Sequence, residues 1–377
     1  MQELSVRSLG AMRDIDRLHW DACAGTENPF LSYAFFSSLE DSGTACADTG
    51  WLPQHLGVFA GPEMVGAVPL YLKSNSQGEF IFDYHWADAY ERAGGAYYPK
   101  LQVAVPFTPV PGARLLLKNP DHQVALLDAL RSVTEQLQVS SLHMTFCPKD
   151  TFELGKDPWL QRTGLQFHWH NRGYASFQDF LDSLSARKRK AIRKEREGVQ
   201  ESGLELLTLN GDSLREEHWE AFYAFYMDTC SRKWGGAQLT REFFQLLHER
   251  MRDRVVLMLA RSGDRYVAGA LNLLGDRCLY GRNWGCLGHY PFLHFELCYY
   301  RAIDFAIERG LERVEAGAQG LHKVARGYEP VHTYSLHYIR DPRFRALLKR
   351  VLLEERAAVD EQQEEIARSV PFRKESQ

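Results

Sequence analysis

The segment Gly61-Pro-Glu-Met-Val-Gly-Ala-Val-Pro-Leu-Tyr71 has a counterpart in the other half of the chain, Gly263-Asp-Arg-Tyr-Val-Ala-Gly-Ala-Leu-Asn-Leu273. In both segments a tight polar turn leads into alternating apolar residues, which is the pattern of a half-buried β-strand. Each is followed by a second turn and an aromatic segment that ends in Trp, namely Phe80–Trp86 and Cys278–Trp284. We expect both aromatic segments to be strands.

The same order of elements continues after each Trp. A loop leads to an amphipathic helix and a further strand, at Val124–Leu137 and Leu142–Phe146 in the first half and at His294–Arg309 and Arg313–Ala316 in the second. Internal similarity of this kind predicts a duplicated unit, and the alternation of helices and strands makes each unit a mixed α/β structure.

Length and composition agree with two domains. The chain has 377 residues, of which 45% are apolar and 25% are charged, so it can form two ordinary hydrophobic cores. We expect an α/β (α+β) fold with a first domain at residues 1–165 and a second at residues 166–377. The formal net charge of −4 argues against a protein whose whole surface binds nucleic acid or anionic lipid.

Several observations favour a cytoplasmic protein. The amino-terminal residues 1–16 lack the apolar core of a signal peptide, and no stretch of sequence has the apolar length of a membrane span. The seven Cys are scattered and form no C-x-x-C pair, which is typical of reduced thiols. The sequence does not indicate an oligomeric state.

Common catalytic and metal-binding motifs are missing from the sequence. It contains no H-E-x-x-H, no G-x-S-x-G elbow, no Walker loop and no G-x-G-x-x-G. His168 and His170 share one face of a predicted strand, but two ligands alone do not hold a metal. We therefore expect neither a metal site nor a permanently bound cofactor.

A basic segment joins the two predicted domains. Residues 177–200 have the apolar period of a helix, with Ser176 as the N-cap, and Arg and Lys dominate residues 187–196. Such a charge run is usually a solvated helix face. However, Lys188 falls where the apolar stripe would continue, so we expect at least one cation to point inward or along a cleft. A second possibility is therefore that this cluster, with Lys188 and Arg189, meets phosphates.

Further along the chain, apolar periodicity predicts two more helices and a strand. The segment from Glu217 is a helix with an aromatic face, and Thr240 is the N-cap of another. The apolar run Val255–Ala260 is a buried strand. From Pro342 the chain is helical at first and then charged.

Aromatic and charged residues alternate in the first half, in the strings Asp83–Asp88, Tyr97–Val103 and Pro106–Arg114. A few polar groups among bulky rings are typical of a pocket wall, with Tyr97 and Lys100 as candidate binding residues. The alternative is that the rings and prolines only clamp a long loop.

The second half has a corresponding concentration. Arg282 and Trp284 lie in the string Gly281–Gly285, and His294 and Glu296 begin the helix that follows. An acidic residue near a helix amino end is electrostatically favourable, so the alternative role of Glu296 is structural.

A glycine-rich string follows at Gly317–Pro330. Glycine turns after a strand let backbone amides approach an anion. Lys323 and Arg326 are three residues apart and lie on one side of the segment if it is helical, with His322 beside them. We expect these residues and Arg282 to bind phosphate or carboxylate groups.

At these residues the chain resembles the FemAB-like proteins, a bacterial family labelled peptidoglycan biosynthesis or recognition proteins, within the GNAT (acyl-CoA N-acyltransferase) superfamily. The resemblance runs from about residue 29 to residue 355. It rests on six long strings, Gly50–Leu56, Tyr71–Asp83, Ala93–Val110, Arg187–Arg196, Leu293–Tyr300 and Gly317–Tyr328.

The resemblance implies two tandem GNAT-like domains, each with a mixed, mostly antiparallel sheet flanked by helices. It also implies an acyltransferase that uses aminoacyl-tRNA or acyl-CoA as co-substrate and a small-molecule or peptide amine as acceptor. By similarity, the Lys323–Gly327 turn corresponds to a basic segment near the end of the Fem catalytic domain. The chain lacks a clear pyrophosphate loop for CoA, and its basic helix is shorter than the arm of the cell-wall enzymes, so both donors stay open.

An N-acyltransferase must hold an activated ester beside an amine, remove a proton and stabilise an oxyanion. We expect the base to be Asp83, His85 or Glu296, and the oxyanion donor to be an amide of Gly281–Gly285 or Gly66–Pro69. The competing hypothesis is a non-catalytic GNAT-fold protein that binds a peptide or a cell-wall fragment.

Overall fold

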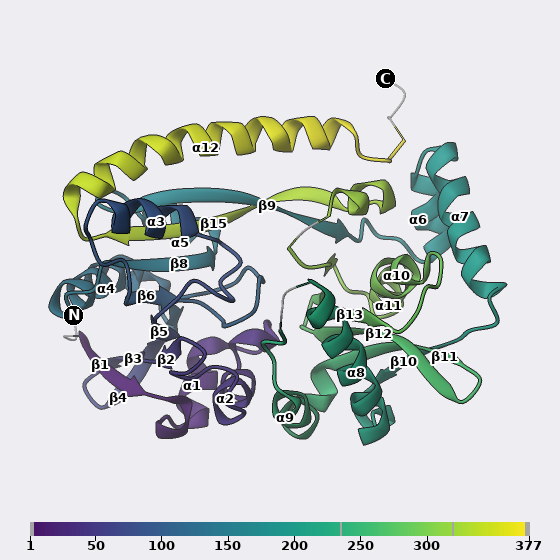
Figure 1. Ribbon diagram of the computed structural model, residues 1–377, viewed down its shortest axis with the longest axis horizontal. Coiled ribbons are helices and arrows are strands. Elements are labelled where there is room, and N and C mark those ends of the chain that lie inside the picture. Colours follow the sequence, from purple (N-terminus) through teal and green to yellow (C-terminus); the bar gives the residue numbers. More distant parts are fainter. Residues whose placement is uncertain (1–3, 234–235, 319, 374–377) are drawn as a thin grey trace. The chain divides into compact units, whose positions relative to one another are not determined.

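The computed structural model describes residues 4–233, 236–318 and 320–373 (Figure 1). The chain forms two compact units, Met1–Leu165 with His332–Glu361, and Gln166–Val331 with Gln362–Gln377. Residues 332–361, which we expected in the second domain, lie in unit 1 because Tyr334–Ile339 pairs with a unit 1 strand. Gln319 of the glycine-rich string lies outside the described residues.

Unit 1 contains two sheets. The smaller is antiparallel with the order β1-β3-β4-β7, and the larger has the order β15-β8-β6-β5-β2, in which only β6 and β8 are parallel. The strands are β1 (Leu4–Gly10), β2 (Trp51–Pro53), β3 (His55–Ala60), β4 (Glu63–Val68), β5 (Leu70–Lys73), β6 (Lys100–Val103), β7 (Leu116–Leu117), β8 (Ser141–Cys147) and β15 (Glu329–Ile339), the last of which begins in unit 2.

Helices cover the unit 1 sheets. They are α1 (Arg17–Ala24), α2 (Tyr33–Asp41), α3 (Tyr84–Arg92), α4 (Gln123–Gln136), α5 (Lys149–Leu154) and the first part of α12 (Pro342–Arg368). The apolar stripe of α4 buries Leu126, Leu127 and Leu130 in the same core as Leu142 and Met144 of β8. Burial of these side chains follows the helical and strand periods that the sequence predicts.

Unit 2 has one sheet with the order β10-β11-β12-β13-β14-β9, in which only β13 and β14 are parallel. Its strands are β9 (Leu160–His170), which begins in unit 1, β10 (Glu205–Asn210), β11 (Val255–Ser262), β12 (Arg265–Leu274), β13 (Cys278–Cys286) and β14 (Arg313–Glu315). Its helices are α6 (Phe177–Ser183), α7 (Ala186–Gln200), α8 (Glu216–Lys233), α9 (Arg241–Met251), α10 (Leu293–Phe295) and α11 (Arg301–Glu308), with a π-turn η6 (Glu296–Tyr300) and a 3₁₀ turn η7 (Leu321–Arg326).

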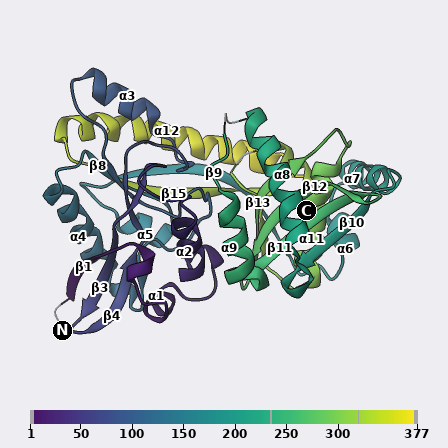
Figure 2. The ribbon, with the colours of Figure 1, turned by 60° about the horizontal axis from the view of Figure 1, so that its bottom comes forward.

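The unit 2 sheet has helices on both faces, as Figures 1 and 2 show for α8 and α11. Gly269 lies under α8, because a Cβ there would be 3.0 Å from the ring of Phe222. Its neighbours Ala268 and Ala270 belong to the core that contains α11. Successive strand residues point to opposite faces, so β12 is buried on both.

The prediction that Phe80–Trp86 is a strand is wrong. Residues 80–83 form a loop and α3 begins at Tyr84. Ser76, Glu79 and Asp83 all bind the buried ammonium of Lys100, and these contacts hold the segment away from the sheet.

Two predicted helices are interrupted. The helix expected at His294–Arg309 consists of α10, the π-turn η6 and α11, and it follows Phe292 in a left-handed conformation, with φ of 64°. The helix expected at residues 177–200 breaks into α6 and α7, because Leu184 and Ser185 are extended and pair with the chain near Phe372.

Other predictions are confirmed. Ser176 and Thr240 cap α6 and α9, each accepting a hydrogen bond of 3.1 Å from the backbone amide three residues on. The apolar run Val255–Ala260 lies in the buried strand β11. Sheets flanked by helices in both units confirm the expected mixed α/β fold class.

Candidate functional site

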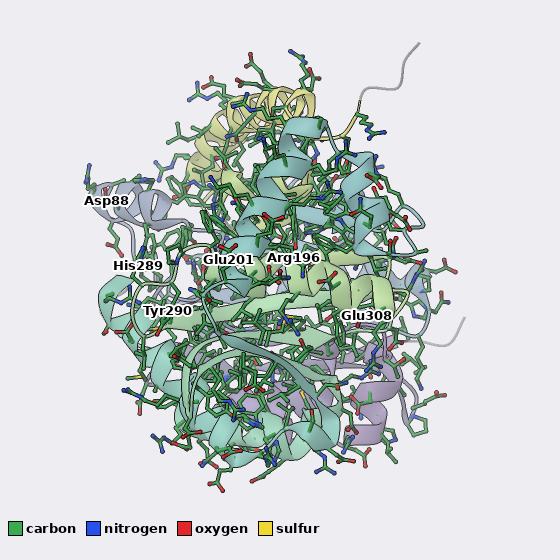
Figure 3. The ribbon with its side chains drawn as sticks, turned by 90° about the vertical axis from the view of Figure 1, so that its right-hand side faces the viewer. Asp88, Arg196, Glu201, His289, Tyr290 and Glu308 are labelled. Carbon is green, nitrogen blue, oxygen red and sulfur yellow. The ribbon has the colours of Figure 1, made fainter. Side chains whose placement is uncertain are left out.

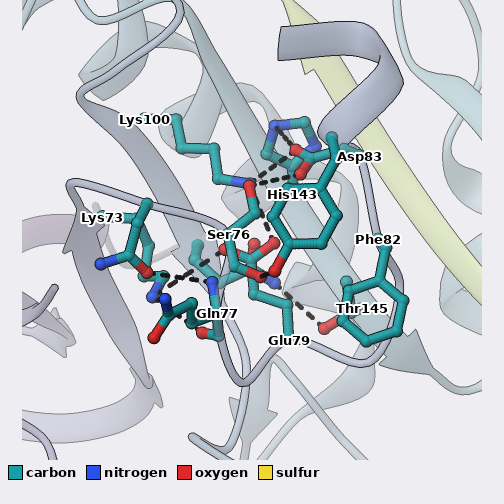
Figure 4. A network of polar contacts seen from close by, with 12 residues as sticks. Lys73, Ser76, Gln77, Glu79, Phe82, Asp83, Lys100, His143 and Thr145 are labelled. Atoms are coloured by element: carbon teal, nitrogen blue, oxygen red, sulfur yellow. Dashed lines mark hydrogen bonds and ion pairs between the residues drawn. The ribbon is translucent and has the colours of Figure 1, made fainter. Parts of the chain in front are cut away.

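Unit 1 contains a buried network of polar side chains around Lys100 (Figure 4). The Lys100 Nζ donates to Ser76 Oγ at 2.8 Å, to Glu79 Oε2 at 2.8 Å and to Asp83 Oδ2 at 2.5 Å. Asp83 also accepts from the hydroxyls of Ser76, at 2.5 Å, and Tyr97, at 2.6 Å. These five side chains are at most 3% exposed.

The network fixes the charges of its members. Burial opposes the charged form of Lys100, but Glu79 and Asp83 raise its pKa above the ordinary value. Burial alone would raise the pKa of Asp83, yet the Lys100 ammonium and the hydrogen bonds hold it well below the ordinary value. At neutral pH these two groups are therefore a stable ion pair.

For Glu79 and Lys73, neighbouring opposite charges offset the effect of burial on the pKa only in part. Burial, opposed by Lys100, raises the pKa of Glu79 to about 7. Burial also lowers the pKa of Lys73 to about 7, although the carboxylate of Glu79 opposes this effect. The Lys73 Nζ is 4.0 Å from Glu79 Oε1 and lies 3.7 Å from the centre of the Trp51 ring.

Two buried histidines adjoin the network. The Nδ1 atoms of His143 and His337 are 2.7 Å apart, so one ring must donate to the other. Burial and the Lys100 charge lower the pKa of His143 to about 3, and burial lowers that of His337 well below its ordinary value. Both rings are neutral at pH 7.

The close contact of Ser76 with Lys100 resembles a Ser–Lys catalytic pair, but the charges do not fit that role. A lysine that activates a serine must be a neutral base. Lys100 is held as an ammonium between two carboxylates, and Ser76 Oγ is fully buried. The arrangement therefore suits a structural ion network in unit 1.

Unit 2 contains a second grouping, of aromatic and imidazole rings. The ring of His294 lies 5.2 Å from that of Trp284, 5.3 Å from that of Tyr299 and 5.9 Å from that of His322, between centroids. The Tyr299 hydroxyl and His322 Nε2 are hydrogen-bonded at 2.8 Å. Burial, with the charges of Lys323 and Arg326, lowers the pKa of His322. The grouping therefore includes an exposed imidazole that is neutral at pH 7.

Lys323 lies beside these rings on the turn η7. Its side chain is buried, and its Nζ donates to the carbonyl of Gly317 at 2.9 Å. Among the described residues, no carboxylate forms an ion pair with Lys323. Burial lowers its pKa to about 8, which leaves a cation at neutral pH with a backbone carbonyl as partner.

Glu296, a predicted base, is the first residue of the π-turn. Arg196 of α7 donates to both of its oxygens, at 3.0 and 3.2 Å, and to Asp304 at 2.7 Å. Burial raises the pKa of Glu296, and the Arg196 charge opposes that rise. Both carboxylate oxygens are occupied, which gives Glu296 an evident structural partner.

Arg326 is held in a comparable way by Glu195 of α7. Its Nη2 donates to the two oxygens of Glu195 at 2.8 and 2.9 Å, and its guanidinium lies 3.4 Å from the centre of the Phe295 ring. The neighbouring positions Glu195 and Arg196 thus connect α7 to η7 and to the π-turn.

The structure divides the predicted site residues between the units. It brings Asp83, Tyr97 and Lys100 together in unit 1, whereas His85 is exposed on α3. In unit 2 it brings together Trp284, His294, His322, Lys323 and Arg326, with Glu296 close by.

The remaining predicted residues lie elsewhere in unit 2. Arg282 is partly buried on β13, where burial lowers its pKa to about 10. Lys188 is half-buried on α7, and Arg189 pairs with Asp182 at 2.9 Å. The half-buried position of Lys188 is in keeping with its place in the apolar stripe of the sequence.

Several residues of the two groupings were not predicted. They are Ser76, Glu79, His143 and His337 in unit 1, and Glu195, Arg196 and Tyr299 in unit 2. One signal was available, since Lys73 and Lys100 lie in short strands next to apolar residues, and a lysine buried in a strand requires carboxylate partners.

Two surface hollows, of about 440 and 360 Å³, lie beside α4, and none of the predicted site residues lines them. Within residues 4–233, 236–318 and 320–373, no three His, Cys, Asp or Glu side chains are arranged to hold a metal ion. In the same ranges, no helix has both the length and the apolar character needed to cross a membrane.

Two solved structures, FemX and L-PGS, share the fold, and a third structure is more distantly similar. FemX has a TM-score of 0.57 and 12% identity, over 89% of this chain and 98% of that chain. L-PGS from Bacillus licheniformis has a TM-score of 0.52 and 11% identity, over 87% and 98%. A tandem GNAT protein from the clavulanic acid biosynthesis pathway has a TM-score of 0.47 and 13% identity, over 90% and 99%.

No curated protein matches the chain. The FemAB-like family model, described as peptidoglycan biosynthesis/recognition, matches residues 11–374. Because this match covers nearly the whole sequence, the expected resemblance is confirmed, and the protein belongs to the FemAB-like family of peptidoglycan biosynthesis or recognition proteins.

Proposed function

We propose that this protein is an N-acyltransferase that transfers an acyl or aminoacyl group from aminoacyl-tRNA or acyl-CoA to the amine of an amino acid or peptide. One observation carries the proposal. A buried cation with no carboxylate partner among the described residues, Lys323, adjoins an exposed neutral imidazole, His322, on a short turn beside aromatic rings. Family membership supports a role in peptidoglycan-related chemistry.

Each residue has a role in this proposal. The Lys323 ammonium binds a phosphate of the donor, since both donor types carry phosphates and a partly desolvated cation binds anions strongly. His322 accepts the proton of the attacking amine. In the tautomer whose Nε2–H donates to the Tyr299 hydroxyl, Nδ1 carries the free lone pair.

The reaction balances without a further reactant. The amine nitrogen forms a bond to the acyl carbon, and the bond from that carbon to the ester oxygen or thioester sulfur breaks. The proton lost by the amine passes through His322 to the leaving oxygen or sulfur. No permanently bound cofactor is required, and the cytoplasmic location expected from the sequence belongs to the same proposal.

The test follows donor consumption by the purified full-length protein. We expect turnover with charged tRNA or with acyl-CoA in the presence of candidate amine acceptors. Lys323→Ala should weaken donor binding, whereas Lys156→Ala, an exposed lysine of unit 1, should not. Equal donor binding by Lys323→Ala and the wild type would contradict the assignment of Lys323.

The choice of donor has its own test. If tRNA is the donor, replacing Arg189, Lys190 and Arg193 on α7 should weaken tRNA association and reduce its dependence on salt. An unchanged association would favour acyl-CoA. Thermal stabilisation by a peptide or cell-wall fragment, without consumption of either donor, would favour the non-catalytic alternative.

A further inference from the structure

Both terminal nitrogens of the Arg326 guanidinium are engaged by the protein itself. Its Nη2 binds Glu195, its Nη1 donates to the carbonyl of His322 at 2.8 Å, and Phe295 covers its face. Its Nε is buried without a hydrogen-bond partner among the described residues. A phosphate could bind this guanidinium only by displacing Glu195, so the geometry gives Arg326 a holding role.

The turn that carries Lys323 and His322 needs a contact that holds it in place. The ion pair between Arg326 and Glu195 provides this contact, and we call it the anchor. It starts after Gly320, with φ of 118°, and ends at Gly327, with φ of 87°. Glycine has no Cβ to restrict the backbone at these two ends, which leaves the turn free to change direction there. Side-chain contacts must therefore fix its position, and Arg326 is the last residue of the turn.

The other end of the anchor is on α7. Glu195 accepts from Arg326 and from the Tyr300 hydroxyl, and its neighbour Arg196 binds Glu296 and Asp304. Figure 3 labels Arg196 of α7, together with Glu201, which follows this helix, and Glu308 at the end of α11. Through these contacts one helix holds both the turn and the start of the π-turn.

We propose that Glu195 is a positioning residue, which fixes Lys323 and His322 at the edge of the aromatic grouping by holding Arg326 on the turn η7. The geometry of the anchor stands by itself, while its purpose rests on the proposed transferase function. Glu195 touches no reacting atom and acts through Arg326.

The test measures the turn directly in the full-length protein. We expect Glu195→Ala to increase the rate at which acetic anhydride modifies Lys323, followed by mass spectrometry, by about tenfold, which corresponds to ~1.4 kcal/mol of easier local opening. Amide hydrogen exchange should rise at residues 320–328 and stay unchanged in the core strands β11 and β12. The matched control, Glu197→Ala, removes an exposed carboxylate of the same helix and should behave as wild type.

Two further variants separate positioning from general stability. Glu195→Gln keeps the shape of the side chain and should give an intermediate rate. The charge-swapped pair Glu195→Arg with Arg326→Glu should return Lys323 towards its slow wild-type rate, because the ion pair is restored. Unchanged modification of Lys323 in Glu195→Ala, or faster exchange in β11 and β12 as well, would overturn the proposal.

The kinetic arm tests the purpose of the anchor. Glu195→Ala should raise the KM for the donor and also lower kcat, because the variant releases both Lys323, which binds the donor, and His322, which takes the proton. If the protein has no transferase activity, this arm fails while the modification and exchange results still report on the anchor. If Glu195→Ala and Glu197→Ala changed KM and kcat by equal amounts, a specific positioning role of Glu195 would be contradicted.

Discussion

Lys100 and Asp83 form an ion pair in the interior of unit 1, with Nζ 2.5 Å from Oδ2 and the side chains 0% and 2% exposed. Removing two charges from water is costly, and the contact is stable because Ser76, Glu79 and Tyr97 complete its hydrogen bonds. The loop between β5 and α3 is therefore fastened to β6 through one ammonium.

Replacing Lys100 by Met should destabilise the protein strongly. The change leaves Asp83 and Glu79 buried without their common partner, for which we expect a loss of about 3–5 kcal/mol in the free energy of unfolding. Urea denaturation measures it. The control Lys118→Met removes an exposed ion pair with Glu63 and should change the stability little. Similar losses in the two variants would contradict the importance of the network.

Glu79 should make stability depend on pH. Its pKa is raised from 4.5 to about 7, so between these values the folded state keeps a proton that the unfolded state has lost. The contribution of Glu79 to stability therefore falls as pH rises through this range and is level above it. The free energies of unfolding of the wild type and of Glu79→Gln, measured at several pH values, should diverge between these two pKa values. The wild type should lose stability relative to the variant as the pH rises. The same dependence of the free energy of unfolding on pH in both proteins would contradict the raised pKa of Glu79.

Donor binding should weaken when Lys323 loses its proton. Its pKa is lowered to about 8, so the ammonium is present below that pH and is lost above it. The dissociation constant of the phosphate-bearing donor should rise from about pH 7 to about pH 9, and Lys323→Arg should remove most of this dependence because arginine keeps its charge. Calorimetric titration of both proteins over this range provides the measurement. A wild-type affinity that is constant with pH would argue against Lys323 as the phosphate ligand.

The end of the turn η7 should require glycine. Gly327 has a φ of 87°, and a Cβ there would lie 2.7 Å from the ring of Phe180. We expect Gly327→Ala to cost about 2–4 kcal/mol through strain and overpacking. Gly173 has a φ of 85° with nothing within 4 Å of a Cβ, so Gly173→Ala, at about 1 kcal/mol, measures the strain alone. Equal losses in the two unfolding experiments would show that Phe180 moves aside.

Prediction from sequence succeeded where the signal is local. The strand at Val255–Ala260 and the cap at Thr240 depend on residues a few positions apart, and both are confirmed. It failed at Phe80–Trp86, where aromatic residues alternate as in a strand. Ser76 and Glu79 beside this segment bind Lys100, which is more than 20 positions further along the chain, and these contacts determine the conformation instead.

The site residues show the same division. The sequence indicated Lys323, His322 and Arg326 because they share one short string. It could not show that Arg326 is taken by Glu195, because 131 positions separate these partners. Nor could the residue type distinguish the compensated ammonium of Lys100 from the uncompensated one of Lys323.

By itself, then, the sequence determined much of the order of helices and strands and the membership of a family, since periodicity, caps and long strings are properties of neighbouring residues. Only the tertiary structure decided which charges neutralise each other and which cation is left for a ligand. Desolvation and Coulomb energies depend on distances in space, and residues far apart in the chain set those distances when the two units fold.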